Sequence, residues 1–160
     1  MTLVASIHKT VGRSFYQVLF CLVLLSIVLM TQAAIASANE AKVTGVSTSG
    51  PTFSVTISSP DSGCDRYANW WEVVTPEGEL LYRRVLLHSH VNEQPFTRSG
   101  GPVTVAGDLP LIVRVHMTPD GYSPNAFSGT IDGGFSEITL AADFALQLAE
   151  HNPLPTSCAF

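Results

Sequence analysis

The sequence lacks the short motifs that most directly indicate catalysis. None of its three cysteines stands in a C-x-x-C pair, which argues against dithiol redox chemistry and against a thiolate zinc site. There is no G-x-S-x-G nucleophile elbow, and the glycines before Pro102 do not open a helix, as a phosphate-binding loop would. The carboxylates show no spacing that suggests paired acid and base roles. We therefore expect a non-catalytic protein more readily than an enzyme.

Basic residues are also scarce, with eight Lys and Arg against thirteen Asp and Glu. Lys9 and Arg13 lie in the first 38 residues, so residues 39–160 hold six basic and thirteen acidic side chains, a net charge of about −7. This charge argues against nucleic acid, and against an anionic membrane surface, as a partner.

Residues 1–38 have the pattern of a signal peptide. Lys9 and Arg13 form a positive region, residues 18–30 form an apolar run, and Ala36-Ser37-Ala38 offers the small residues of a cleavage site. We expect cleavage after Ala38, which leaves a single domain at residues 39–160 with no membrane span, in the periplasm or outside the cell. The alternative is an uncleaved anchor, because the apolar run extends to about twenty residues if its polar interruptions are accepted.

Two cysteines, Cys64 and Cys158, remain after the expected cleavage. In an exported chain an even pair indicates a disulfide, which here would tie the C-terminal tail to an early strand. The alternative is two free thiols.

Alternating apolar and polar residues predict an all-β domain. Phe53, Val55 and Ile57 alternate with Ser and Thr, and the same period recurs in other segments separated by Gly, Pro and Asp. Pro76 and Gly78 mark the corner of a hairpin. We predict an antiparallel sandwich like those of immunoglobulin or fibronectin type III domains, with strands at residues 41–48, 53–58, 64–75, 80–87, 103–106, 109–117 and 126–131.

Residues 138–150 have a different pattern. Leu140, Phe144 and Leu148 recur every four residues with alanines between them, which predicts a short amphipathic helix packed on the sandwich. A further strand is the alternative, since Phe144, Leu146 and Leu148 also alternate.

The central part of the chain carries a long motif, YAxxWEVxxPxG…HxHxxEQPFTR. Its residues here are Tyr67-Ala68, Trp71-Glu72-Val73, Pro76, Gly78, His88, His90 and Glu93-Gln94-Pro95-Phe96-Thr97-Arg98. In this motif the chain resembles a group of short exported bacterial proteins of unassigned function. The resemblance covers about a third of residues 39–160 and implies no activity. Cys64 departs from the tryptophan of that group, and Ser123-Pro124 departs from its glycines.

Two histidines of this motif could bind a metal ion. His88 and His90 are two residues apart, so both imidazoles leave the same face of an extended backbone. Glu93 or His116 could supply a third ligand, and imidazole with carboxylate suits zinc or copper. The simpler alternative is that both histidines hydrogen-bond to the loop and fix its shape.

We interpret the segment from His88 to Arg98 as a contact surface. Its candidate ligand-binding side chains are those of His88, His90, Glu93, Gln94, Phe96 and Arg98. The leading hypothesis is a secreted or periplasmic binding or accessory module that contacts an envelope protein or a small ligand. The alternative is a zinc-binding or copper-binding protein, or a metalloenzyme, that uses His88, His90 and one further ligand.

Overall fold

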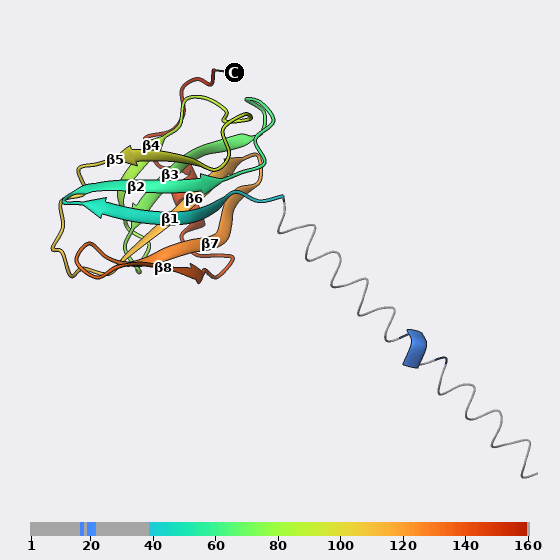
Figure 1. Ribbon diagram of the computed structural model, residues 1–160, viewed down its shortest axis with the longest axis horizontal. Helices are drawn as coiled ribbons and strands as arrows, with labels where there is room; N and C mark the ends of the chain where they lie inside the picture. The colour runs from blue at the N-terminus through green and yellow to red at the C-terminus, as the bar shows by residue number, and fades with distance from the viewer. Residues whose placement is uncertain (1–16, 18, 22–38, 160) are drawn as a thin grey trace, which may run out of the picture. The chain divides into compact units, whose positions relative to one another are not determined.

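The computed structural model describes residue 17, residues 19–21 and residues 39–159 of the chain (Figure 1). The predicted signal peptide and its cleavage site after Ala38 lie outside the described residues, apart from residues 17 and 19–21, and so stay a prediction. The description below concerns residues 39–159 alone. In the parts that the structure describes, no helix has both the length and the apolar character needed to cross a bilayer.

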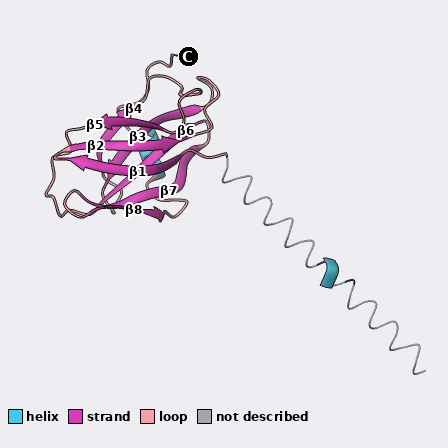
Figure 2. Ribbon diagram, in the orientation of Figure 1, coloured by secondary structure: helices cyan, strands magenta, loops and turns pink. Residues whose placement is uncertain are grey.

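Two antiparallel sheets form the domain, which confirms the predicted sandwich (Figure 2). One sheet has the strand order β1-β2-β5, and the other has the order β4-β3-β6-β7-β8. The third and sixth strands are therefore neighbours, although more than thirty residues separate them. The strands are β1 (Lys42–Ser49), β2 (Thr52–Ser58), β3 (Tyr67–Val74), β4 (Leu80–Val85), β5 (Phe96–Gly100), β6 (Leu111–Thr118), β7 (Gly121–Thr130) and β8 (Gly134–Thr139).

The alternation of apolar and polar residues along the strands produces the core between the sheets. Phe53, Val55 and Ile57 of β2 are fully buried, and they belong to the same core cluster as Val113 and Val115 of β6. The hydroxyls on the other face of β2 pair with those of β5: Ser54 Oγ lies 2.8 Å from Ser99 Oγ, and Thr56 Oγ1 lies 2.9 Å from Thr97 Oγ1. Such cross-strand pairs fix the register of an exposed face.

Strand β5 corrects one prediction. We expected a strand at residues 103–106 and a polar loop up to Arg98, but the strand is Phe96–Gly100 and residues 103–106 form none. Val103 still enters the core, and its backbone N–H donates to the Pro51 carbonyl. The ladder position beside β2 is already taken by β5, so Val103 contributes a buried side chain without a strand.

The predicted helix at residues 138–150 is wrong in most of its length. Strand β8 continues to Thr139, and the only helical turn among residues 138–150 is the 3-10 helix η1 (Leu146–Glu150). Ile138, Leu140, Phe144 and Leu148 do pack on one face, where they cover Val74, Ile112 and Ala126. The apolar residue at every fourth position thus indicates that this face is buried. The backbone of residues 138–145 is extended or forms turns.

Residues 140–159, called the C-terminal strap below, lie on the outer face of the five-stranded sheet. They explain why all eight residues of β3 are buried, although a strand of an antiparallel sheet often has one face in solvent. The predicted Cys64–Cys158 disulfide is confirmed and closes a sequence separation of 94 residues. Gly78, with φ of 84° at the β3–β4 turn, lies under Ala145 of the strap, where an added Cβ would meet the Ala145 Cβ at 2.9 Å.

Three buried charged side chains lie beneath the strap. Glu72 of β3 is paired in register with Arg83 of β4 on one side and Arg114 of β6 on the other. Both Nε and Nη2 of Arg83 donate to Glu72 Oε2, at 2.8 and 2.6 Å. Arg114 Nε donates to Oε1 at 2.8 Å, and Arg114 Nη2 is also 2.8 Å from Oε1. All three side chains are at most 1% exposed.

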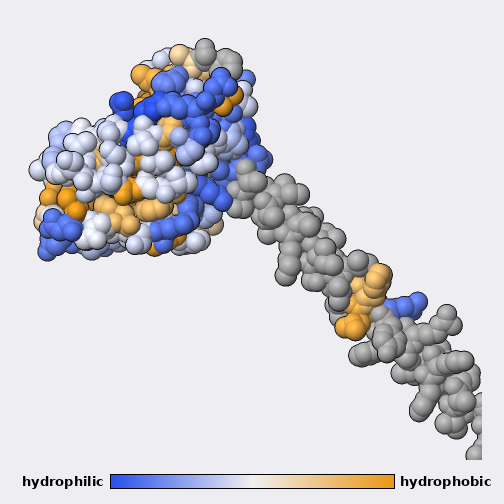
Figure 3. Space-filling model, viewed as in Figure 1, coloured by the Kyte–Doolittle hydropathy of each residue, from blue (hydrophilic) through white to orange (hydrophobic). Residues whose placement is uncertain are grey.

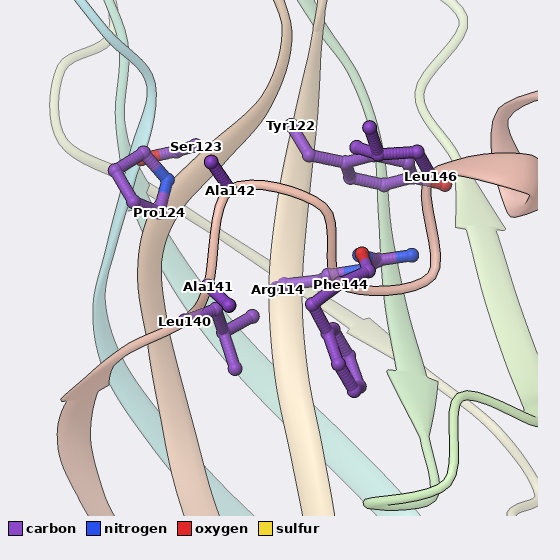
Figure 4. Close-up of a pocket in the computed structure, with 9 residues that line it drawn as sticks. All are labelled: Arg114, Tyr122, Ser123, Pro124, Leu140, Ala141, Ala142, Phe144 and Leu146. Carbon is purple, nitrogen blue, oxygen red and sulfur yellow. The ribbon is translucent and has the colours of Figure 1, made fainter.

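The two guanidinium groups also hold the strap. Arg114 donates to the carbonyls of Phe144 and Ala145, at 2.7 and 3.0 Å. Figure 4 shows the strap passing over Arg114, with Tyr122 and Phe144 on either side of it, next to a cavity of about 120 Å³. Arg83 donates to the carbonyls of Leu148, His151 and Pro153.

Replacing Glu72 tests whether this ion triad supports the fold. The Glu72→Gln substitution removes the only carboxylate between two buried guanidinium groups, and leaving a buried charge uncompensated costs about 3 to 5 kcal/mol. We expect the free energy of unfolding, measured by urea denaturation, to fall by about that amount. Glu79→Gln, an exposed carboxylate in the neighbouring hairpin turn, serves as the control and should change it by less than about 0.5 kcal/mol. Equal effects of the two substitutions would contradict the role of the triad.

Candidate functional site

The predicted contact residues fall in and beside the loop between β4 and β5, residues 86–95, called the β4–β5 loop below. This loop lies at one end of the sandwich, and the end of the strap pairs with it. Ser89 N–H donates to the Ala159 carbonyl at 3.2 Å, and Ala159 N–H donates to the Leu87 carbonyl at 2.8 Å. Figure 1 shows the C-terminus at this end of the domain. The strap therefore supports the loop directly.

Asp61 fixes the loop from the other side. Its Oδ1 accepts hydrogen bonds from Ala68 N–H at 2.9 Å and from the Ser59 hydroxyl at 2.7 Å, while its Oδ2 accepts from His90 N–H at 2.8 Å. Sequence reasoning missed Asp61, because Ser59-Pro60-Asp61-Ser62-Gly63 has the composition of an ordinary turn. The available signal was an Asp two residues after Ser59, since such side chains commonly bond backbone amides in turns.

Gln94 makes three further bonds that hold the loop. Its Oε1 accepts from Ser59 N–H at 2.9 Å, and its Nε2 donates to the Ser59 hydroxyl and to the His90 carbonyl, both at 3.1 Å. Gln94 was predicted to contact a ligand, but these bonds engage both ends of its amide within the domain. Its role in this structure is to position the loop.

His88 and His90 lie together, as the H-x-H spacing predicts, but in unlike surroundings. Their ring centroids are 4.4 Å apart, with His88 exposed and His90 only 3% exposed. The His90 ring also stacks on the Phe96 ring, with centroids 3.6 Å apart. Phe96 is 1% exposed and belongs to the core, where it anchors the loop.

The surroundings of His90 favour its neutral form. Burial lowers its pKa, and the positive charge of Arg98 lowers it further, against an opposing effect of Asp61. Both ring nitrogens of His90 and the hydroxyl of Ser89 are buried without a hydrogen-bond partner among the described residues. The alternative that the imidazoles hydrogen-bond to the loop therefore fails for His90. Buried polar atoms without partners are uncommon, and they often accompany a bound water or ligand.

Glu93 and Arg98 form an exposed ion pair beside these rings. Arg98 Nη2 donates to Glu93 Oε2 at 2.8 Å, and this bond lowers the pKa of the Glu93 carboxyl. The guanidinium of Arg98 also lies 5.4 Å from the centre of the Phe96 ring. The two charged residues of the predicted surface thus partly neutralise each other.

The three-ligand metal site is not assembled in this structure. Within residues 39–159 and the four described positions before them, no three His, Cys, Asp or Glu side chains come together as a metal site. His116, one of the candidate third ligands, stacks on Trp70 instead, and the other candidate, Glu93, pairs with Arg98. His88 and His90 remain a pair of imidazoles without a third protein ligand.

The loop presents a mixed apolar and polar surface. Leu87 is 51% exposed and Val91 is 39% exposed, and the polar Asn92 and Glu93 follow Val91. A hollow of about 280 Å³ is lined by residues 88–93. On the face of the domain shown in Figure 3, hydrophobic residues form small separate areas among polar ones.

His116 occupies a second polar cluster, on the outer face of the five-stranded sheet. Its ring stacks on Trp70 with centroids 3.8 Å apart and planes 9° from parallel, and its Nδ1 lies 2.7 Å from Asn69 Oδ1. Asn69 Nδ2 donates to the Thr118 hydroxyl at 2.6 Å, which orients the amide. Burial, together with the charges of Arg83 and Arg114, lowers the pKa of His116 to about 4.

The lowered pKa of His116 predicts a loss of stability in mild acid. Its pKa is about 6.5 in the unfolded chain and about 4 in the folded one, so between these values the unfolded state binds more protons. The free energy of unfolding should therefore fall as the pH drops from 6.5 to 4, and His116 should contribute about 2 kcal/mol of the fall, after allowance for its partial exposure. The measurement is urea denaturation across this range.

The control is His116→Gln, which cannot titrate. Its stability should depend less steeply on pH than that of the parent protein, by the same 2 kcal/mol or so over the range. His90, whose pKa is also lowered, remains in both proteins and cancels from the comparison. Parallel curves for the two proteins would contradict the assignment.

Comparison with known proteins gives one partial likeness. Over 82 residues the chain is 42% identical to a protein of Halomicrobium mukohataei named "Putative lipoprotein". The match spans 51% of this chain and 40% of that protein's length. No family model matches the chain, and no solved structure matches it either. The chain is thus similar, over half of its length, to part of a protein named as a lipoprotein.

Proposed function

We propose that this chain is an exported, non-catalytic binding module that contacts a partner protein of the cell envelope or its surroundings through the β4–β5 loop. The observation that carries the proposal is the way the loop is held. Asp61, Gln94 and the end of the strap fix its backbone, while Leu87 and Val91 remain exposed at its surface. A loop that is rigid before binding loses little conformational entropy when a partner docks.

Export is supported by three independent features. Residues 1–38 carry the pattern of a signal peptide, the Cys64–Cys158 disulfide suits an oxidising compartment, and the partly similar relative is named as a lipoprotein. The choice between the periplasm and the outside of the cell does not affect the contact surface.

Charged substitutions in the loop test the proposed surface. The double variant Leu87→Asp, Val91→Asp places two carboxylates on the apolar part of the loop, where desolvating them against a partner would be unfavourable. We expect capture of partner proteins from an envelope extract to fall at least tenfold relative to the parent, measured by quantitative pull-down.

Leu109→Asp is the matched control, because Leu109 is 37% exposed on a different loop. It should leave capture unchanged. If the Leu109 variant and the loop variant capture the same proteins to the same extent, the β4–β5 loop is not the contact surface. Circular dichroism of each variant verifies that its fold is retained.

A second candidate function, binding of copper or zinc, is favoured by the imidazole pair. The 4.4 Å separation of the His88 and His90 rings, and the unpartnered nitrogens of His90, suit two ligands to one ion whose remaining positions are taken by water. Two imidazole ligands favour Cu(II) over Zn(II), following the general order of affinities.

Calorimetric titration with Cu(II) tests this candidate. Because His88 is exposed, His88→Ala should fold normally, and we expect it to lower the affinity for Cu(II) by at least tenfold. His151→Ala, which removes an exposed imidazole far along the chain, is the control and should bind as the parent does. Equal affinity of all three proteins would show that any copper bound is not held by this pair.

A further inference from the structure

A groove runs between the outer face of the five-stranded sheet and the strap. It is open to solvent and has a volume of about 450 Å³, within the range of small-molecule sites. One wall comes from β3 and β6 and includes Tyr67, Asn69, Trp70, His116 and Thr118; the other comes from the strap and includes Glu150. This groove is separate from the hollow lined by residues 88–93 in the β4–β5 loop.

The walls of the groove are fixed in relation to each other. The Cys64–Cys158 disulfide ties the strap to the chain just before β3. Arg83 of the sheet donates to the carbonyls of His151 and Pro153, and these residues lie between Glu150 and Pro155 of the strap wall. The groove is therefore part of the folded state and does not have to form when a ligand arrives, which favours affinity.

The protonation state of His116 determines what the groove can bind. A neutral imidazole carries one N–H and one bare nitrogen. The network assigns the N–H to Nδ1, because Nδ1 faces the carbonyl oxygen of Asn69, whose amide nitrogen donates to Thr118. Nε2 is then a hydrogen-bond acceptor, and no hydrogen bond within the described part of the chain involves it. Stacking on Trp70 holds the ring, and so Nε2, in place.

The charge of the site favours a neutral ligand. Asn69, Thr118 and neutral His116 carry no charge, and burial raises the pKa of the Tyr67 phenol, so it too is neutral at pH 7. The two guanidinium groups under the strap and the carboxylates of Glu72 and of Glu150, at the exposed rim, add up to no net charge. Because Nε2 is an acceptor, the ligand has to donate a hydrogen bond to it.

We propose that this groove binds a neutral, hydroxyl-bearing ligand of the size of one or two sugar rings, with a ligand hydroxyl donating to His116 Nε2. The ligand hydroxyls would meet the polar groups of β3 and β6, and the carbon face of the ring would lie against the partly exposed apolar side chains of the strap wall, Leu154 and Pro155. The inference goes beyond the proposed function, since it concerns a different surface of the domain.

The test is an NMR titration of the isotopically labelled full chain with neutral sugars, namely glucose, N-acetylglucosamine and maltose, alongside the cationic sugar glucosamine. We expect saturable shifts confined to the groove, at Asn69, His116 and Thr118, with at least one neutral sugar. If none of the three produces a saturable shift at these residues up to about 50 mM, the proposal is overturned. This readout needs no variant, so it does not depend on the folding of any mutant.

Two substitutions identify the contact. His116→Phe retains a ring to stack on Trp70 but has no acceptor, and loss of one hydrogen bond should weaken binding of the sugar about tenfold. Glu150→Gln removes the rim charge and should change the affinity for a neutral sugar less than twofold. Tighter binding of glucosamine than of every neutral sugar, abolished by Glu150→Gln, would instead indicate a cation site and overturn the proposal.

The loop variant Leu87→Asp, Val91→Asp separates this inference from the proposed function. It should bind the sugar as the parent does, even where it no longer captures a partner protein. Loss of sugar binding in this variant would place the ligand at the β4–β5 loop and remove the groove as the site.

Discussion

The structure depends on one buried carboxylate shared by two guanidinium groups. Glu72 lies at the centre of the five-stranded sheet, and Arg83 and Arg114 reach it from the strands on either side. Burying three charges carries a large desolvation cost, which is offset only when geometry and additional hydrogen bonds are good. Here the cost is offset by the strap, because its carbonyls accept the N–H groups that Glu72 leaves free. The ions and the strap therefore require each other.

This mutual requirement explains why the strap follows one particular path across the sheet, which hydrophobic burial alone would not produce. An apolar outer face could be covered by many helices or strands in many registers, whereas directed N–H groups accept only carbonyls at particular positions. The strap has little regular structure of its own, with one short 3-10 helix at Leu146–Glu150. Its path is set by the guanidinium groups, by the apolar contacts of Phe144 and Leu148, and by the disulfide at Cys158.

The sequence predicts those parts of the fold that follow from local periodicity. The alternation in residues 53–58 and 109–117, the hairpin at Pro76 to Gly78 and the pairing of Cys64 with Cys158 are all confirmed. Strand β5 was missed, because Phe96 is its only fully buried residue and the hydroxyls of Thr97 and Ser99 resemble a loop until they meet those of β2. The helix was predicted wrongly because burial of every fourth residue does not require helical backbone when side chains from elsewhere supply the hydrogen bonds.

Local sequence patterns predict even less of the candidate site than of the fold. The H-x-H spacing correctly places two imidazoles together, yet it gives no sign that one is buried against Phe96 while the other is exposed. This difference comes from contacts that the spacing does not show, among them those of His90 with Asp61 and Phe96.

The two surfaces for which we propose binding roles share the strap as a support. Ala159 pairs with the β4–β5 loop, and residues between Ala149 and Pro155 form a wall of the groove. Both connections lie beyond Ala145, the second strap residue whose carbonyl Arg114 holds. The carbonyls of His151 and Pro153, which Arg83 holds, lie within the groove wall, and Ala159 follows them along the chain. A change that loosens the strap at Glu72 should therefore disturb both surfaces, whereas a change in either surface leaves the ions in place. The ion triad thus supports both surfaces through the strap. The groove and the loop are also joined directly, because Leu86 N–H of the loop donates to the Asn69 carbonyl at 2.9 Å.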